Sequence, residues 1–300
     1  MSTPPTSYSR LMPFIAAAAG VGFLSLMDAF MKEAALATGT YTATVLRSLF
    51  GAAIIAPFFL AQRKGWPTRS VMKLHIERGI ISAFMALSFF FALTKLPLAE
   101  AIAISFVAPL IALYLARIML GEVIQRKAIF ASILGFAGTI VIISGRLGRE
   151  EVSDDVLMGL GALTFSALLY AYNFVVIRKQ SQLAGPVEIA TFHSGVGGAV
   201  LLLLAPFFGT IPETGALWAI AAAGALTVMG AMAIAWAYAR AEAQALVPIE
   251  YTGFLWASVL GWAFFKEPVT LPTIAGTALI VTGCWIAARG PRERLAATAS

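Results

Sequence analysis

Six of the polar or ionisable side chains that stand within apolar stretches of the chain are candidates for chemistry: Asp28, Arg47, Glu100, Asn173, His193 and Glu250. Side chains of these types can pair with one another, bind a charged substrate or carry a proton. Inside a bilayer each charge costs about 2.5–3.5 kcal/mol on insertion scales, so intramembrane charges mark function by default. What these residues can do therefore depends on the segments that hold them.

The composition indicates that those segments cross a membrane. The 300 residues are 60% hydrophobic and 12% charged, whereas a soluble domain has about 25% charged residues. High hydrophobicity with low charge also excludes a disordered chain. The apolar runs have about 20 residues, the length that a helix needs to cross the hydrocarbon core. We therefore predict an all-α integral membrane protein with ten transmembrane helices.

The ten apolar runs fall at residues 11–33, 41–61, 74–94, 97–118, 127–145, 156–178, 187–208, 214–239, 243–265 and 270–288. The first run is longer than the apolar region of a signal peptide and contains Asp28 and Lys32, so we expect it to be retained. If the N-terminus is cytoplasmic, the inner segments hold fourteen Lys and Arg residues and the outer segments five. This asymmetry predicts that both termini are cytoplasmic.

The two halves of the chain resemble each other. A shift of 145 residues places Glu122 on Glu267, and a shift of 146 places Arg47 on His193. The predicted repeats, 1–145 and 146–300, each hold five helices. Because five is odd, the second copy enters the membrane upside down. Inverted repeats with a substrate site near the midplane are typical of secondary transporters.

Depth along the predicted helices groups the polar residues into an outer and an inner cluster. The outer cluster contains Asp28, Arg47 and Glu100, and the inner cluster contains Asn173, His193 and Glu250. Two polar clusters related by an inverted repeat are what two gates would look like. Proline breaks at Pro109 and Pro248 are hinge candidates, because the backbone groups that they free must face protein or a water-filled cavity.

Structural interpretations of the same residues remain open. Arg47 and Asp28 can pair simply to hold the first two helices together. Glu100 can extend to the outer interface near Lys95, and His193 can bond a neighbouring helix without further role. Four other residues are expected to be interfacial or structural: His75, Glu77, Glu122 and Glu267.

Aromatic residues close to the inner polar cluster are candidates for the wall of a cavity: Tyr172, Trp236, Tyr238 and Tyr251. A cavity with aromatic walls and few polar groups suits a flat, partly apolar metabolite. The alternative is that these residues belong to the aromatic belts at the membrane surfaces.

The segment "ALTKLPLAEAIAISFVAPLIALYLARIMLGE", followed by "GFAGTIVII", resembles the EamA-type repeat of the drug/metabolite transporter superfamily. The segment "WAYARAEAQALVPIEYTGFLWASVLGWAFFKEPVT", with "AGTALIVTG", resembles it more loosely. The resemblance implies two inverted five-helix repeats, cytoplasmic termini and a central cavity. Members of this kind export aromatic and neutral amino acids, and others carry riboflavin, S-adenosylmethionine, nucleosides or sugar phosphates.

We therefore expect a monomeric carrier of the inner membrane that exports amino acids by alternating access, with protons as a candidate coupling ion. Uptake of another metabolite (riboflavin, S-adenosylmethionine or nucleoside type) is the alternative, followed by a passive channel or a membrane-embedded enzyme. The chain has one cysteine, no phosphate-binding GxxxxGK[ST] motif and a single aspartate within a span, Asp28. We thus predict no catalytic residue, metal, cofactor or nucleic-acid partner.

Overall fold

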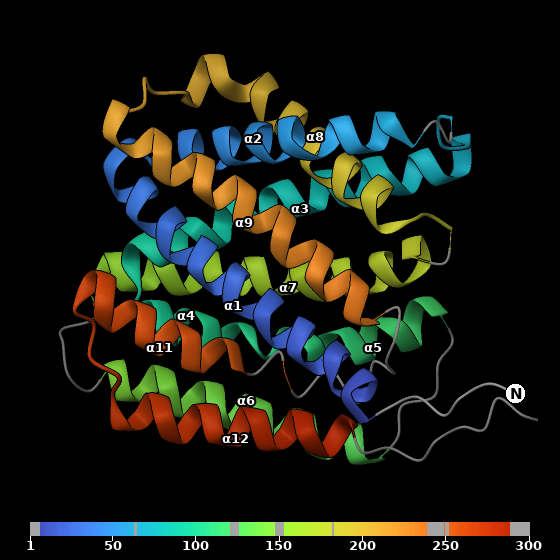
Figure 1. The fold of residues 1–300 in the computed structure, drawn as a ribbon. Coiled ribbons are helices and arrows are strands. Elements are labelled where there is room, and N and C mark those ends of the chain that lie inside the picture. The colour runs from blue at the N-terminus through green and yellow to red at the C-terminus, as the bar shows by residue number, and fades with distance from the viewer. Residues whose placement is uncertain are drawn as a thin grey trace, which may run out of the picture.

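The computed structural model describes residues 7–62, 65–120, 126–147, 153–181, 183–238, 249 and 252–288. Within these ranges every regular element is a helix (Figure 1). The helices are α1 (Ser7–Thr38), α2 (Thr40–Ala61), α3 (Arg69–Lys95), α4 (Leu98–Ser105), α5 (Ala108–Leu120), α6 (Arg126–Leu147), α7 (Asp154–Ser181), α8 (Pro186–Phe208), α9 (Thr214–Tyr238), α11 (Thr252–Phe265) and α12 (Leu271–Ala288).

The prediction of an all-helical membrane protein is confirmed in its coarse form. Six of the described helices, α1, α2, α3, α7, α8 and α9, are long and apolar enough to cross a membrane, and α11 and α12 contain shorter apolar helical stretches. Large apolar side chains lie on the outside of the bundle, such as Leu203 (77% exposed) and Phe207 (79% exposed). An apolar exterior is what lipid tails accept, because they offer no partner for polar groups.

The predicted helix over 97–118 is divided into α4 and α5. The amide N–H groups of Phe106 and Val107 donate to the carbonyls of Ala103 and Ile104, at 3.2 and 3.1 Å, so the last turn of α4 tightens and the helix ends. Pro109 lies in the first turn of α5, where its missing N–H costs nothing. The chain thus breaks just before the proline instead of bending at it.

Most close helix pairs join the first part of the chain to the second. α1 lies along α9, α3 along α7, α2 along α8, and α6 along α12. Figure 1 shows α6 and α12 side by side at one edge of the molecule, with α2 and α8 at the opposite edge. The interior is therefore assembled from segments that are far apart in the sequence.

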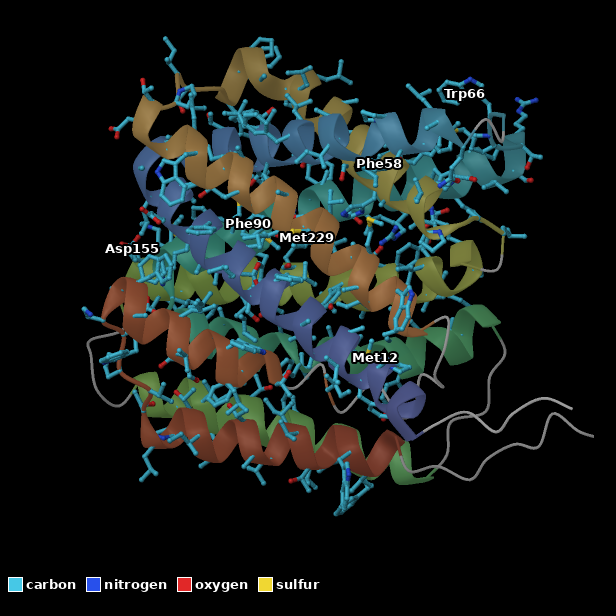
Figure 2. The ribbon with its side chains drawn as sticks, viewed as in Figure 1. Met12, Phe58, Trp66, Phe90, Asp155 and Met229 are labelled. Carbon is cyan, nitrogen blue, oxygen red and sulfur yellow. The ribbon has the colours of Figure 1, made fainter. Side chains whose placement is uncertain are left out.

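The bundle has two ends that differ in packing. The Lys32 end, as we name it, holds the end of α1, the end of α3 and the start of α4; the His75 end holds the start of α3 and the start of α8. Asp155 and Trp66 mark these two ends in Figure 2. The largest cluster of buried apolar side chains, including Met31, Leu93 and Leu98, lies towards the Lys32 end.

Candidate functional site

A small polar cavity lies where α2, α3, α8 and α9 meet. Its lining residues are Arg47, Ser48, Ser82, Ala83, His193, Ser194, Gly197 and Thr227. The cavity has room for about one water molecule. Each of the four helices contributes a hydroxyl or a charged side chain, so the cavity offers hydrogen bonds from several directions.

Glycines let the four helices approach closely around this cavity. A Cβ on Gly79 of α3 would lie 2.5 Å from Val196 of α8, and a Cβ on Gly224 of α9 would lie 2.9 Å from the Cβ of Phe50 on α2. Close approach through small residues is the usual way in which membrane helices pack. The cavity is narrow because the backbones on two sides of it nearly touch.

Arg47 supplies a positive charge at the cavity. Its side chain is 8% exposed, and its Nη1 donates to the Thr227 hydroxyl at 3.2 Å. The guanidinium carbon lies 5.2 Å from the centre of the Phe90 ring, which is a cation–π distance; Figure 2 shows Phe90 in the middle of the bundle. Asp28 interacts electrostatically with Arg47, but the two side chains do not form an ion pair within 4.0 Å.

Three buried polar atoms at the cavity have no hydrogen-bond partner among the described residues: Arg47 Nε, Ser82 Oγ and His193 Nδ1. A buried polar group without a partner costs about 1–3 kcal/mol. Such groups need an explanation, and a ligand or water that completes them is one. The three residues that carry these atoms all line the cavity.

A second polar network joins α3 to α7 and α8 at the His75 end. Arg78 donates from Nε to the Asn173 amide oxygen and from Nη1 to the Gln180 amide oxygen, both at 3.1 Å. Because the Gln180 oxygen faces Arg78, its amide nitrogen faces His75 and donates to Nδ1 at 2.5 Å. His75 Nε2 then donates to Glu188 at 2.9 Å.

A third polar group closes the Lys32 end. Lys32, 5% exposed, forms an ion pair with Glu267 and donates to the Leu96 carbonyl at 2.8 Å. The other oxygen of Glu267 accepts the Leu98 N–H at 2.8 Å. Lys266, with φ at 56°, takes the left-handed conformation at the end of α11, and Glu267 N–H donates back to the Gly261 carbonyl. This turn places the Glu267 carboxylate over α1 and α4.

The structure brings some predicted site residues together and separates others. Arg47 and His193 were predicted in different clusters, yet they line one cavity, because α2 and α8 lie alongside each other. Asn173 bonds Arg78, and Tyr172 donates to Glu77 at 2.5 Å, so both tie α7 to α3. Trp236 is 38% exposed.

Other expectations receive a correction or lie outside the described residues. His75 is 1% exposed, so it is buried between helices instead of lying on the surface of the protein. Glu100, 6% exposed, accepts from the Thr273 hydroxyl at 3.4 Å and does not reach the surface, whereas Lys95 pairs with Asp155. Five predicted groups fall outside the described residues: Glu122, Pro248, Glu250, Tyr251 and the side chain of Tyr238.

The sequence interpretation missed most of the cavity hydroxyls. Ser82 and Thr227 are 145 residues apart, the offset of the predicted repeat. Ser48 and Ser194 are 146 residues apart, as Arg47 and His193 are. The predicted repeat therefore already contained a signal for these hydroxyls. Ser82 and Thr227 were overlooked because short hydroxyl side chains are common in membrane helices, where they bond their own backbone.

Comparison with known proteins places the chain among transporters. A model described as "EamA-like transporter family" matches residues 11–144 and again residues 157–289. The chain is 26% identical over 262 residues to a "Pseudopaline exporter CntI" of Pseudomonas aeruginosa, covering 87% of this chain and 90% of that protein.

Two further comparisons extend this result. An "S-adenosylmethionine uptake transporter" of Rickettsia felis is 24% identical over 261 residues, covering 86% of this chain and 85% of that protein. A solved structure titled "Crystal structure of protein" is similar in fold, with a TM-score of 0.63 at 20% identity, covering 94% of this chain and 98% of that one.

Proposed function

The chain belongs to the EamA-like transporter family, and we propose that it moves a small metabolite across the inner membrane by alternating access. Amino acids, aromatic or neutral, are the proposed exported cargo. The match of the family model to both halves of the chain is the observation that carries this proposal. Alternating access needs a site that each side of the membrane can reach in turn.

The helix contacts support two inverted five-helix repeats. If α1, α2, α3, α5 and α6 correspond to α7, α8, α9, α11 and α12, the pairing of α1 with α9 mirrors that of α7 with α3. The glycine contacts follow the same rule, because Gly79 on Val196 mirrors Gly224 on Phe50. In this proposal α4 and α5 together make one crossing, and α11 belongs to another, which gives ten.

The residues that line the cavity are related by the same pseudo-symmetry. Its residues form three matched pairs: Arg47 with His193, Ser48 with Ser194, and Ser82 with Thr227. A site shared by the two repeats can face either side when one repeat tilts against the other. We propose that this cavity is the part of the substrate path that the present conformation leaves open inside the bundle.

The proposal also includes the orientation of the chain in the membrane and the roles of the other predicted site residues. We propose cytoplasmic termini from the Lys and Arg asymmetry, a monomer, and protons as the coupling ion. Asp28, Glu100 and Glu250 are proposed gate residues, with Pro109 and Pro248 at hinges. Cysteines introduced at Ser2 and Ser300 test the topology: both should react only with a membrane-permeant reagent in intact cells, and labelling on opposite sides would contradict it.

Transport in proteoliposomes tests the function. Labelled amino acids, S-adenosylmethionine, riboflavin and nucleosides should be compared with and without a pH gradient. Saturable flux with counter-flow of one of them is expected of a carrier, and flux without saturation would indicate a channel. S-adenosylmethionine uptake is the second candidate, because one similar protein bears that name. Arg47→Ala and Glu250→Ala should lower transport without preventing insertion; parental rates in both would contradict their assignment.

A further inference from the structure

We infer that the Arg47 cavity is a binding subsite for a carboxylate group of the substrate. This inference rests on the proposed function, since it names the substrate class that the cavity would take. The inference starts from three buried polar atoms that have no described hydrogen-bond partner. They belong to the side chains of Arg47, Ser82 and His193.

The charge balance around the cavity favours an anion. Arg47 and Arg78 are both buried, at 8% exposure each, and both act electrostatically on the His193 ring. The described partners of Arg78 are neutral amides, and Arg47 bonds a neutral hydroxyl. Asp28 is the carboxylate whose charge acts on Arg47. Neither of these two buried guanidinium groups forms an ion pair within 4.0 Å with a described carboxylate, so both leave positive charge available to an anion.

The cost of burying such charges makes an anionic ligand favourable. A cation removed from water is stabilised only if an anion or a full set of hydrogen bonds replaces its hydration. Arg47 Nε has no described acceptor. A guanidinium presents parallel N–H donors that match the two oxygens of a carboxylate, so a carboxylate would fill the empty position better than a neutral amide, which offers a single acceptor oxygen.

The hydroxyls around Arg47 complete the subsite. The Ser82 hydroxyl, whose side chain is 3% exposed, lacks a partner and can donate to a carboxylate oxygen. Thr227 Oγ1 already donates to the Ala223 carbonyl at 2.8 Å and accepts from Arg47, so it fixes the guanidinium in place. His193 Nδ1 adds a further donor when it carries the proton.

The size of the cavity limits what enters it. The cavity has room for about one water molecule, whereas a carboxylate carries two oxygens on one carbon. The carboxylate and the rest of the substrate therefore both need space that opens when the helices around the cavity separate. The inference therefore concerns one chemical group, the carboxylate, and not the identity of the remainder.

Thermal unfolding of the full chain in lipid nanodiscs tests this subsite. Sodium benzoate and benzamide serve as probes, because they have nearly the same shape and differ in charge; ionic strength is held constant with sodium chloride. Binding to the folded state raises the unfolding temperature. Benzoate should raise it by a few degrees in the parental protein, and benzamide should not.

Variants identify the binding group. Arg47→Gln should abolish the shift with benzoate, whereas Arg69→Gln, which removes an exposed arginine at the start of α3, should preserve it. Arg47→Lys keeps the charge but not the paired donors, so its shift should be reduced. If Arg47→Gln does not give monodisperse protein, Ser82→Ala should reduce the shift instead.

The results separate this inference from the proposed function. An equal shift with benzamide, no shift in the parental protein, or an undiminished shift in the Arg47 or Ser82 variants would overturn the carboxylate subsite. The liposome assay is independent: transport of a panel compound with no benzoate shift would leave the carrier standing and remove the subsite. A benzoate shift lost in Arg47→Gln without transport of any panel compound would support the subsite and overturn the proposed cargo.

Discussion

At the Lys32 end of the bundle, an ammonium and a carboxylate tie α1 to α4 and to the connection between α11 and α12. At the His75 end, an imidazole, a carboxylate and an amide tie α3 to α7 and α8. Both bridges join three parts of the fold. They differ in chemistry: the Lys32 end holds an ion pair between an ammonium and a carboxylate. The His75 end holds hydrogen bonds in which one imidazole accepts from an amide and donates to a carboxylate.

The surroundings of the two bridges differ as well. Lys32 lies against the largest apolar cluster, with Phe265 at 4.9 Å from its ammonium. His75 stacks on Phe192, with 4.5 Å between ring centres, beside the aromatic pair of Phe59 and Trp66. One end is thus fastened by an ion pair in a large apolar core, and the other by hydrogen bonds beside a group of aromatic rings.

The largest expected effect comes from breaking the ion pair at the Lys32 end. Glu267→Gln removes the carboxylate that pairs with the buried Lys32 ammonium, which should cost about 3–5 kcal/mol of stability. Unfolding of the purified protein measured against detergent or temperature would show this loss. Adding Lys32→Met should restore part of it, because the ammonium that Glu267 paired with is then gone. A double variant as unstable as the single one would show that the pair is not what fastens this end.

Helix spacing at the Lys32 end gives the next effect. A Cβ on Gly159 of α7 would lie 2.8 Å from the Cβ of Lys95, whereas a Cβ on Gly161 of the same helix meets nothing within 4 Å. Gly159→Ala should therefore cost about 1–3 kcal/mol through overpacking. Gly161→Ala, the matched control, should be neutral or stabilise by up to about 1 kcal/mol. Equal stabilities would mean that α3 and α7 adjust freely here.

The hydrogen-bonded bridge at the His75 end should give a smaller effect than the ion pair. Glu188→Gln replaces the carboxylate that accepts from His75 with a neutral amide. We expect it to destabilise the protein by about 1 kcal/mol, because a hydrogen bond to a charged acceptor contributes more than one to a neutral acceptor. The unfolding measurement used for Glu267→Gln should show this smaller loss, and a loss of equal size in both variants would remove the contrast between the two ends.

The smallest expected effect is at the rim of the Lys32 end. Lys95 and Asp155 form an ion pair of 2.7 Å, but their side chains are 26% and 65% exposed. An exposed pair of this kind contributes about 0–1 kcal/mol, and salt weakens it further. Asp155→Asn should therefore change stability by less than about 0.5 kcal/mol. A larger loss would mean that the outermost turn of α7 contributes to fastening this end.

The sequence predicted the helices well and the polar contacts poorly. Runs of apolar residues identify spans because length and hydropathy are local properties, and the predicted runs at 41–61, 187–208 and 214–239 differ from α2, α8 and α9 by a residue or so. The meeting of Arg47 with His193 depends on which helices lie side by side. That choice is made by close-packed glycines such as Gly79 and Gly224, and composition alone does not encode their partners.

His75 is a second residue whose contacts could not be predicted from the sequence. Its position near the start of a predicted helix indicated the membrane surface, yet α7 and α8 cover it and Gln180 bonds it from more than a hundred residues away. The break before Pro109 was signalled by the proline, but the chain places it in the preceding turn because proline is best tolerated where no N–H is needed. Local sequence patterns thus identified these residues, whereas the packing of distant helices determined which side chains surround His75.

The pairing of α1 with α9, α3 with α7 and α6 with α12 has a consequence for how the protein is made. While the ribosome is still translating, the early helices sit in the bilayer without the neighbours that will cover their polar faces. Gly138 and Gly276, whose backbones meet where α6 crosses α12, cannot come together until the end of the chain has been inserted. The contact between α6 and α12 therefore forms late in synthesis, after most of the chain is in place.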